Sequence, residues 1–192
     1  MLINEGGLIR AIKRAYKAGG YTVLNTGNDV AIYTDHWFAM ANRALLPRKV
    51  LATIVEHMGM IPERDMPTSI IKDTEPQLVL RETAADHWRG GDRGEEVTMV
   101  PVIMQGFQIY QPPGGGACWG VPLYLVDMIE RDPAEHIGAD VIDKDRLLWE
   151  ADGEAVVINA VRKACSGWAK EWERAVWDAL EGVDLHKEEA GR

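Results

Sequence analysis

The chain has 192 residues, of which 46% are hydrophobic and 27% are charged, and its formal net charge is −9. This composition is typical of a globular protein of one domain or of two small ones, and we find no low-complexity segment or repeat. The longest apolar runs are far short of the roughly 20 residues of a membrane span, and the N-terminus lacks the apolar core of a secretory signal. We therefore expect a cytoplasmic protein.

Residues 6–59 predict a compact unit of helix, hairpin, third strand and second helix. Apolar residues recur at helical spacing in 8–18, and Gly19-Gly20 ends that helix. Two β-rich runs, 21–25 and 30–33, flank a turn that contains glycine and asparagine, which is typical of a hairpin. A third run, 37–40, extends the sheet, and a second amphipathic helix runs from about Pro47 to Gly59.

Beyond Gly59 the pattern is looser. Residues 60–67 predict a linker or long loop, residues 68–72 and 77–81 predict short strands, and residues 97–103 and 106–110 predict another hairpin. Residues 121–129 fit either a buried strand or a short helix. A helical pattern runs from about 154 to 180, and its apolar face, which includes Cys165, Trp168 and Trp172, is expected in the core. The predicted fold class is α+β, with small antiparallel sheets packed with amphipathic helices and a long C-terminal helix. Residues 1–60 form one unit and residues 61–192 an acidic second one, or both share a domain.

The charges are unevenly distributed along the chain. Residues 1–50 hold seven Lys or Arg against three acids, a net charge of +4, and the rest holds 14 basic and 27 acidic side chains, a net charge of −13. This asymmetry suits a protein that meets a nucleic acid or an acidic surface with its N-terminal unit, or a basic cleft with the remainder. The alternative is a charge-balanced surface that only keeps the protein soluble.

Two sets of charged residues and one tryptophan are the candidate binding residues. In the first helix four cations share one face, and two more follow at the start of the second helix; together we call them the basic stripe, and a phosphate-contacting surface is one role for it. The acidic segment 130–154 would face a basic cleft. Trp177 lies off the apolar stripe of the last helix and would anchor a partner or cover a core edge. The candidates are Arg10, Lys13, Arg14, Lys17, Arg48, Lys49, Glu130, Asp140, Asp143, Asp145, Glu150 and Trp177.

The histidines do not predict a metal site. Four of the five follow an acid, at positions 36, 57, 87 and 136, but adjacent side chains point in different directions and no HExxH pair is present. We therefore expect no metal and no cofactor. The tripeptide Asp-His-Trp occurs at 35–37 and 86–88, but the flanking residues differ and we interpret the repeat as coincidence.

Cys118 and Cys165 are the only cysteines, and free thiols are favoured over a disulfide between them. The segment Ala117-Cys118-Trp119 is similar to the nucleophile segment of papain-like and transglutaminase-like enzymes, which implies a cysteine hydrolase. The histidines that follow are poorly placed, since His136 comes only 18 residues later. A flexible glycine turn with a packed tryptophan is the favoured interpretation.

The segments LIRAIKRAYKAGGYTV and LPRKVLATIVEHMGMIP resemble small accessory proteins carried by prophages and mobile elements of gut bacteria. This resemblance covers about the first 60 residues. It implies an anti-CRISPR protein, an inhibitor of a host defence nuclease of Cas9 type. On this hypothesis the acidic segment occupies the nucleic-acid cleft of a Cas9-like ribonucleoprotein, and the basic stripe contacts guide RNA or DNA. The alternatives are a nucleic-acid-binding accessory protein that uses the basic stripe and a hydrolase centred on Cys118.

Overall fold

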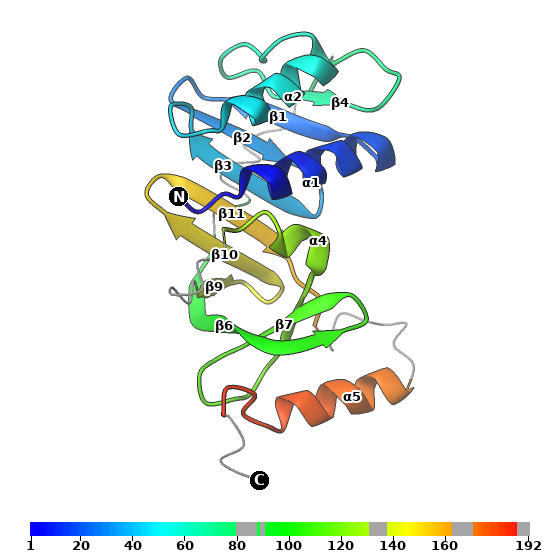
Figure 1. Ribbon diagram of the computed structural model, residues 1–192, viewed down its shortest axis with the longest axis vertical. Helices are drawn as coiled ribbons and strands as arrows, with labels where there is room; N and C mark the ends of the chain where they lie inside the picture. The colour runs from blue at the N-terminus through cyan, green and yellow to red at the C-terminus, as the bar shows by residue number, and fades with distance from the viewer. Residues whose placement is uncertain (80–87, 89–90, 131–137, 163–170, 188–192) are drawn as a thin grey trace. The chain divides into compact units, whose positions relative to one another are not determined.

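The computed structural model describes residues 1–79, 88, 91–130, 138–162 and 171–187 (Figure 1). Its contacts divide the chain into two compact units, and both are discontinuous in sequence. The N-terminal unit comprises Met1–Gly90, Tyr124–Glu130 and Trp149–Ile158. The C-terminal unit comprises Gly91–Leu123, Arg131–Leu148 and Asn159–Arg192.

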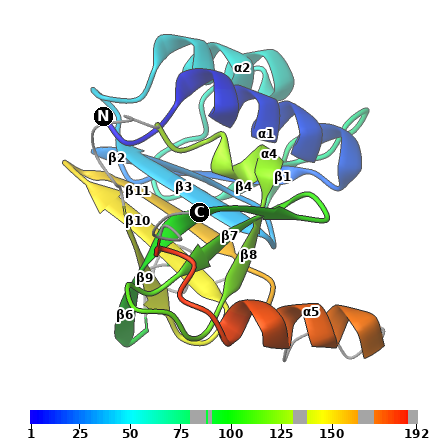
Figure 2. The same ribbon diagram turned by 60° about the horizontal axis from the view of Figure 1, so that its bottom comes forward.

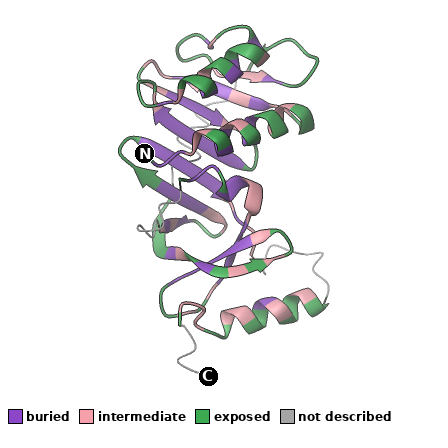
Figure 3. Ribbon diagram, in the orientation of Figure 1, coloured by how far each residue is buried: buried purple, intermediate pink, exposed green. Residues whose placement is uncertain are grey.

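Two helices cover one face of the sheet in the N-terminal unit, as Figures 1 and 2 show. Helices α1 (Glu5–Ala18) and α2 (Arg48–Met58) pack against each other, and the strands pair antiparallel with their neighbours. In Figure 3 the central strands of this sheet are mostly buried, while much of each helix faces solvent. The strand order is β5 (Gln77–Leu78), β4 (Thr68–Ile70), β1 (Tyr21–Asn25), β2 (Asp29–Tyr33), β3 (Trp37–Asn42) and β11 (Glu154–Asn159).

Helix α1 is fixed at both ends by local hydrogen bonds. At its start the side chain of Asn4 accepts a hydrogen bond from the Gly7 amide at 2.8 Å, as an N-cap does. At its end the amides of Gly19 and Gly20 both donate to the Ala15 carbonyl, and Gly20 has a φ of +91°. A side chain at Gly20 would be strained, so the glycine allows the chain to turn directly into β1.

The C-terminal unit is built on a hairpin and a helix. Strands β6 (Arg93–Met104) and β7 (Phe107–Gln111) join through a two-residue turn in which Gln105 and Gly106 both have positive φ. Helix α5 (Glu171–Glu181) packs Trp177 against Val100, Ile109 and Cys118. The strand order is β10 (Arg146–Ala151), β9 (Ala139–Ile142), β6, β7 and β8 (Trp119–Pro122); the short helix α4 (Leu123–Val126) follows β8.

The predicted fold class is wrong. Antiparallel strands dominate the described residues of both units, where small sheets packed with helices were expected. The long C-terminal helix is also wrong, because residues 154–159 form β11 and only Glu171–Glu181 of the predicted span is described as helix. Its predicted core residues Cys165 and Trp168 lie outside the described residues.

Two local features of the sequence explain why β11 was predicted as a helix. Ala155–Ile158 is a continuous apolar run, and such a run has no period that separates a buried strand from a helix. The decisive signal precedes it: Asp152 and Gly153, with φ of +48° and +81°, form the two-residue turn between β10 and β11. Asp-Gly is among the strongest hairpin signals in a sequence, so this dipeptide predicts the turn between β10 and β11.

The element order predicted for the first 59 residues is confirmed, as is the hairpin within 97–110. For residues 121–129 the structure gives both alternatives in turn, since β8 is followed by α4. The division of the chain after residue 60 stays a prediction. Among the residues that the structure describes, no helix combines the length and the apolar character that a membrane crossing requires.

Candidate binding pocket beside helix α1

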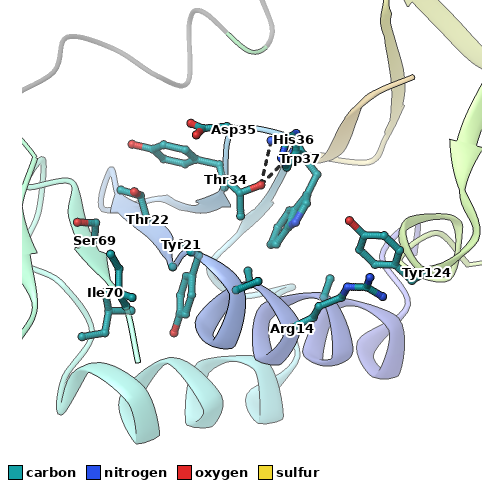
Figure 4. Close-up of a pocket in the computed structure, with 17 residues that line it drawn as sticks. Arg14, Tyr21, Thr22, Thr34, Asp35, His36, Trp37, Ser69, Ile70 and Tyr124 are labelled. Atoms are coloured by element: carbon teal, nitrogen blue, oxygen red, sulfur yellow. Dashed lines mark hydrogen bonds between the residues drawn. The ribbon is translucent and has the colours of Figure 1, made fainter. Parts of the chain in front are cut away.

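A cavity of about 320 Å³ opens in the N-terminal unit, between the second half of α1 and the nearby ends of β1, β2, β3 and β4 (Figure 4). Three buried side chains form its apolar floor: Tyr21 at the start of β1, Trp37 at the start of β3, and Ile70 at the end of β4. On the helix side the lining residues are Ala11, Ala15 and Ala18, followed by Gly19 and Gly20. Because these helical residues are small, the helix leaves space above the sheet that larger side chains would fill.

The floor is held in place by a neutral side-chain cluster behind it. The Tyr21 hydroxyl lies 3.0 Å from Nδ1 of His57 on α2, and the His57 ring stacks on Tyr16 at 4.0 Å. Burial raises the pKa of Tyr21, and Tyr16 and Glu56 add to the effect. Burial lowers the pKa of His57, with Glu56 opposing and Lys13 adding to this. Both groups are therefore uncharged near neutral pH, so the contact is an ordinary hydrogen bond that orients the Tyr21 ring.

The turn between β2 and β3 forms one side of the rim. The Thr34 hydroxyl accepts hydrogen bonds from the amides of His36 and Trp37, at 3.0 and 3.3 Å, and the Thr34 amide donates to the Trp37 carbonyl. Asp35 and His36 are exposed at the tip of this turn. Figure 4 shows Trp37 pointing from the turn into the cavity, so the same turn orients one floor residue and presents two polar ones.

A cation lies on another part of the rim. The guanidinium of Arg14 lies 4.0 Å from the centre of the Tyr124 ring, a cation–π arrangement that leaves its N–H groups available at the edge. Both residues line the cavity, and Figure 4 shows them side by side. The pocket thus combines an apolar floor with a positively charged group and a negatively charged group at its mouth, an arrangement typical of ligand sites.

The structure divides the predicted basic stripe. Arg10 pairs with Asp127 at 3.4 Å, and Lys49 pairs with Glu5 at 2.9 Å. The helical geometry behind the prediction is right, because all four cations of α1 are at least partly solvent-facing. The stripe is nevertheless not a uniform row of free cations, and only Arg14 reaches the pocket. Lys13, Lys17 and Arg48 are exposed.

The acidic candidates do not form one patch of free carboxylates. Glu130 accepts a hydrogen bond from the Asn4 side chain at 2.6 Å, within the N-terminal unit. In the C-terminal unit Asp140 pairs with Arg93 at 3.1 Å, and Asp143 pairs with Arg146. Asp145 lies in the loop between β9 and β10, and Glu150 lies on β10 in the N-terminal unit.

Trp177 is 5% exposed and lies in the core of the C-terminal unit. Its predicted role as a partner anchor remains untested, but the structure favours the alternative, a side chain that closes a core edge. Trp172 was expected in the core and is instead 51% exposed. The prediction assigned the wrong face of the helix to the core, because it extended the helical pattern back into residues that form β11.

Cys118 is fully buried, and the structure gives it the environment of an inert thiol. Its sulfur contacts the Gln111 side chain and the Gly116 carbonyl. Burial, aided by Glu181 and partly offset by Gln111 and Arg162, raises the pKa of the thiol to about 11. Such a cysteine is protonated at neutral pH and is a poor nucleophile. The structure therefore favours the packed-tryptophan alternative over the hydrolase, since Trp119 is buried and donates to the Lys144 carbonyl.

Two of the histidines make hydrogen-bond contacts with other groups of the protein. His57 belongs to the cluster behind the pocket, and His186 lies 3.0 Å from the Gln111 carbonyl. His87 and His136 lie outside the described residues. Within the part of the chain that the structure describes, no group of three His, Cys, Asp or Glu side chains is placed to hold a metal ion.

Comparisons with known proteins identify no family. No family model matches the chain, and no curated protein matches it. Among solved structures, a DNA polymerase III beta subunit from Eubacterium rectale matches with 8% identity and a TM-score of 0.38, over 91% of this chain and 67% of that one. The beta subunit from Pseudomonas aeruginosa matches with 15% identity and a TM-score of 0.38, over 84% of this chain and 66% of that one. Likeness at this level carries no argument about function here.

The hypothesis of a phage anti-CRISPR protein with a Cas9-like partner is nonetheless contradicted. The two structures reported above are DNA polymerase III beta subunits, and they do not point to an inhibitor of host defence. Its physical basis is also weakened, because Asp140 and Asp143 are neutralised by arginines of their own unit. The resemblance of the first 60 residues to accessory proteins of mobile elements stays a prediction that these comparisons do not test.

Proposed function

We propose that this protein is a binding protein whose N-terminal unit receives an apolar group of a ligand in the pocket beside α1. The observation that carries the proposal is the fixed apolar floor of Tyr21, Trp37 and Ile70 beneath a mouth with charged groups. The floor is oriented before any ligand arrives, because Tyr21 is held by His57 and Trp37 by the Thr34 turn. Such preorganisation lowers the ordering cost of binding.

The size of the pocket sets the affinity that we expect. Burying roughly 100 Å² of ligand apolar surface contributes about 2.5 kcal/mol, and a charge-assisted hydrogen bond to Arg14 adds about 1.5 to 3 kcal/mol. The sum corresponds to a Kd of roughly 0.1 to 1 mM for a small aryl carboxylate. A single ring therefore binds weakly, and a natural ligand extends beyond the pocket.

The test is an NMR titration of the full chain with indole-3-acetate. Saturable chemical-shift changes are expected at the amides of Gly19, Gly20 and His36, which surround the pocket. Tryptamine, which has the same ring and the opposite charge, is expected to bind about tenfold more weakly because of Arg14.

The same substitution, alanine to phenylalanine, is made inside and outside the pocket to show whether binding occurs there. Ala15→Phe fills the pocket and is expected to abolish the shift changes, while Ala52→Phe, at an exposed position of α2, is expected to leave them unchanged. Ala18→Phe serves as a second blocking variant if Ala15→Phe lowers the melting temperature. Binding that persists in both blocking variants, or no binding by the wild type, would show the proposal to be wrong.

The proposed compartment is the cytoplasm. Cys118 has a free thiol, which fits a reducing compartment. Localisation of a tagged full-length chain by cell fractionation tests this point separately.

A further inference from the structure

We infer that the ligand of this pocket is an acidic segment of another protein, which inserts one apolar side chain into the pocket and lays its carboxylates along α1. The inference rests on the proposed function and adds the class of partner. It is carried by the distribution of charge around the pocket and by the size of the cavity.

Four cations of the basic stripe, Lys13, Arg14, Lys17 and Arg48, have no salt bridge among the described residues, and of these Arg14 lines the pocket. Arg10 is paired with Asp127 and Lys49 with Glu5, so these two charges are largely neutralised at short range. For Arg14 and Lys17 the described residues provide no acidic partner within ion-pair distance; the contact of Arg14 is with the face of the Tyr124 ring. Positive charge therefore remains at the second half of α1, which is the half that lines the pocket.

The spacing of these two cations favours an extended ligand. Lys17 lies about 4.5 Å farther along the helix axis than Arg14 and about 60° around it. A single ring seated on the floor reaches Arg14 at the rim but not Lys17. An extended peptide advances about 3.3 Å per residue, so an acidic residue within about three positions of the inserted side chain reaches each cation.

The cavity has the size of an anchor site. Its volume of about 320 Å³ lies at the small end of what whole small-molecule ligands occupy, roughly 300 to 1,000 Å³. A large apolar side chain fits into such a space, and the backbone of the segment that carries it would lie outside. This division between a buried apolar anchor and a charged rim is typical of protein–protein recognition.

The experiment compares three pools of fluorescein-labelled peptides that share a central Leu-Phe pair. Their flanks are drawn from Asp and Glu, from Ser and Gly, or from Lys and Arg, and binding to the full chain is measured by fluorescence anisotropy. The acidic pool is expected to bind about fivefold to tenfold more tightly than the neutral pool at about 50 mM salt, and the advantage is expected to shrink at about 500 mM salt. The basic pool is expected to bind most weakly.

Matched variants separate the charge effect from the pocket. Arg14→Gln/Lys17→Gln is expected to remove the advantage of the acidic pool while the neutral pool still binds. Lys13→Gln/Arg48→Gln removes the same net charge at exposed positions that do not line the pocket, and it is expected to keep the advantage. Ala15→Phe is expected to abolish binding of every pool.

Each outcome decides a different point. Equal binding of the three pools, with sensitivity to Ala15→Phe, would overturn the acidic-segment inference and leave the proposed function standing. An advantage that survives Arg14→Gln/Lys17→Gln would overturn it as well. Failure of all pools and of indole-3-acetate would remove both proposals. A labelled oligothymidine that binds more tightly than the acidic pool and is insensitive to Ala15→Phe would replace the peptide with a nucleic acid.

Discussion

In the N-terminal unit two segments that are distant in sequence approach closely at Gly7, which has no side chain. In the C-terminal unit, by contrast, the buried side chain of Gln111 binds the chain that follows α5. A Cβ at Gly7 would lie 1.7 Å from the carbonyl oxygen of Asp127. Gln111 is fully buried and donates to the carbonyls of Leu180 and Val183, and it accepts from the Leu185 amide.

The difference shows two ways of ordering a loop-rich junction. At Gly7 the two segments meet through their backbones, so no side chain is needed between them. A buried amide satisfies the backbone groups of a segment that has no regular structure, and it fills the space in doing so. Substitutions at Gly7 and Gln111 test these two arrangements separately.

The largest effect is expected from Gly7→Ala. The added methyl group overlaps the Asp127 carbonyl, so α1 or the segment 124–130 has to move, and we expect a loss of about 3 to 4 kcal/mol in unfolding free energy. Gly6→Ala is the matched control, because the nearest atoms to a Cβ there lie 3.4 Å or more away. It is expected to stabilise the helix by about 0.5 to 1 kcal/mol. Urea unfolding of both variants decides, and equal effects would contradict the prediction.

Gln111→Leu is expected to cost about 3 kcal/mol. The apolar replacement has a similar volume but leaves the Leu185 amide and two carbonyls without their buried partner. Hydrogen exchange measures the effect where it occurs: the Leu185 amide is expected to lose protection, while amides of β1 to β3 keep theirs. Gln77→Leu, at an exposed position of β5, is the control and is expected to change stability by less than about 0.5 kcal/mol. Unchanged protection of Leu185 would show that Gln111 does not hold this segment.

Glu154 is a buried carboxylate of the N-terminal unit. It is 1% exposed; one carboxylate oxygen accepts a hydrogen bond from the Leu2 amide, and the other has no hydrogen-bond partner. Glu154→Gln keeps an acceptor for Leu2 and removes the buried charge, so we expect a change within about 0.5 kcal/mol. Glu154→Ala removes the acceptor and leaves a void, and we expect a loss of about 2 kcal/mol. Thermal unfolding of the two variants checks the order; a larger loss for Gln than for Ala would contradict it.

How much the sequence predicted depends on how far apart the interacting residues are. The helix of 8–18, its glycine stop and the hairpin of 21–33 rest on neighbours in sequence, and all three were predicted correctly. The pairing of β3 with β11 joins Trp37 to Ile158, and no local pattern marks such a partner. The sheet was therefore predicted too small, and the residues that complete it were assigned to a helix.

The candidate site was only partly predictable for the same reason. Helical periodicity placed Arg14 on the exposed face of α1 correctly, yet the salt bridge of Arg10 to Asp127 spans 117 positions. The pocket takes its residues from α1, four strands and Tyr124. Asp35, His36 and Trp37 belong to a tripeptide that occurs twice in the sequence, and we interpreted that repeat as coincidence. The sequence feature that could have indicated the pocket is the spacing of Ala11, Ala15 and Ala18 along one side of the first helix. These small side chains leave the space that the pocket occupies.

The smallest predicted effect concerns His57, behind the pocket floor. Its pKa is lowered in the folded protein by burial, so the unfolded chain takes up the proton first as the pH falls. The stability contribution is complete above the unfolded value of 6.5 and is lost as the pH falls from there toward the lowered folded value. A protonated His57 can only donate at Nδ1, and it carries a charge into the half-buried cluster, so we expect the floor of the pocket to loosen over the same range.

Two variants isolate this contribution. His57→Phe retains a ring to stack on Tyr16 but does not titrate, so its unfolding free energy is expected to fall less steeply than that of the wild type below the unfolded pKa of 6.5. His36→Gln, at the exposed turn of the rim, is expected to keep the wild-type slope. Indole-3-acetate binding to the wild type is expected to weaken over the same range, and less so in His57→Phe. Parallel pH profiles for wild type and His57→Phe would show that the cluster behind the floor does not couple protonation to the pocket.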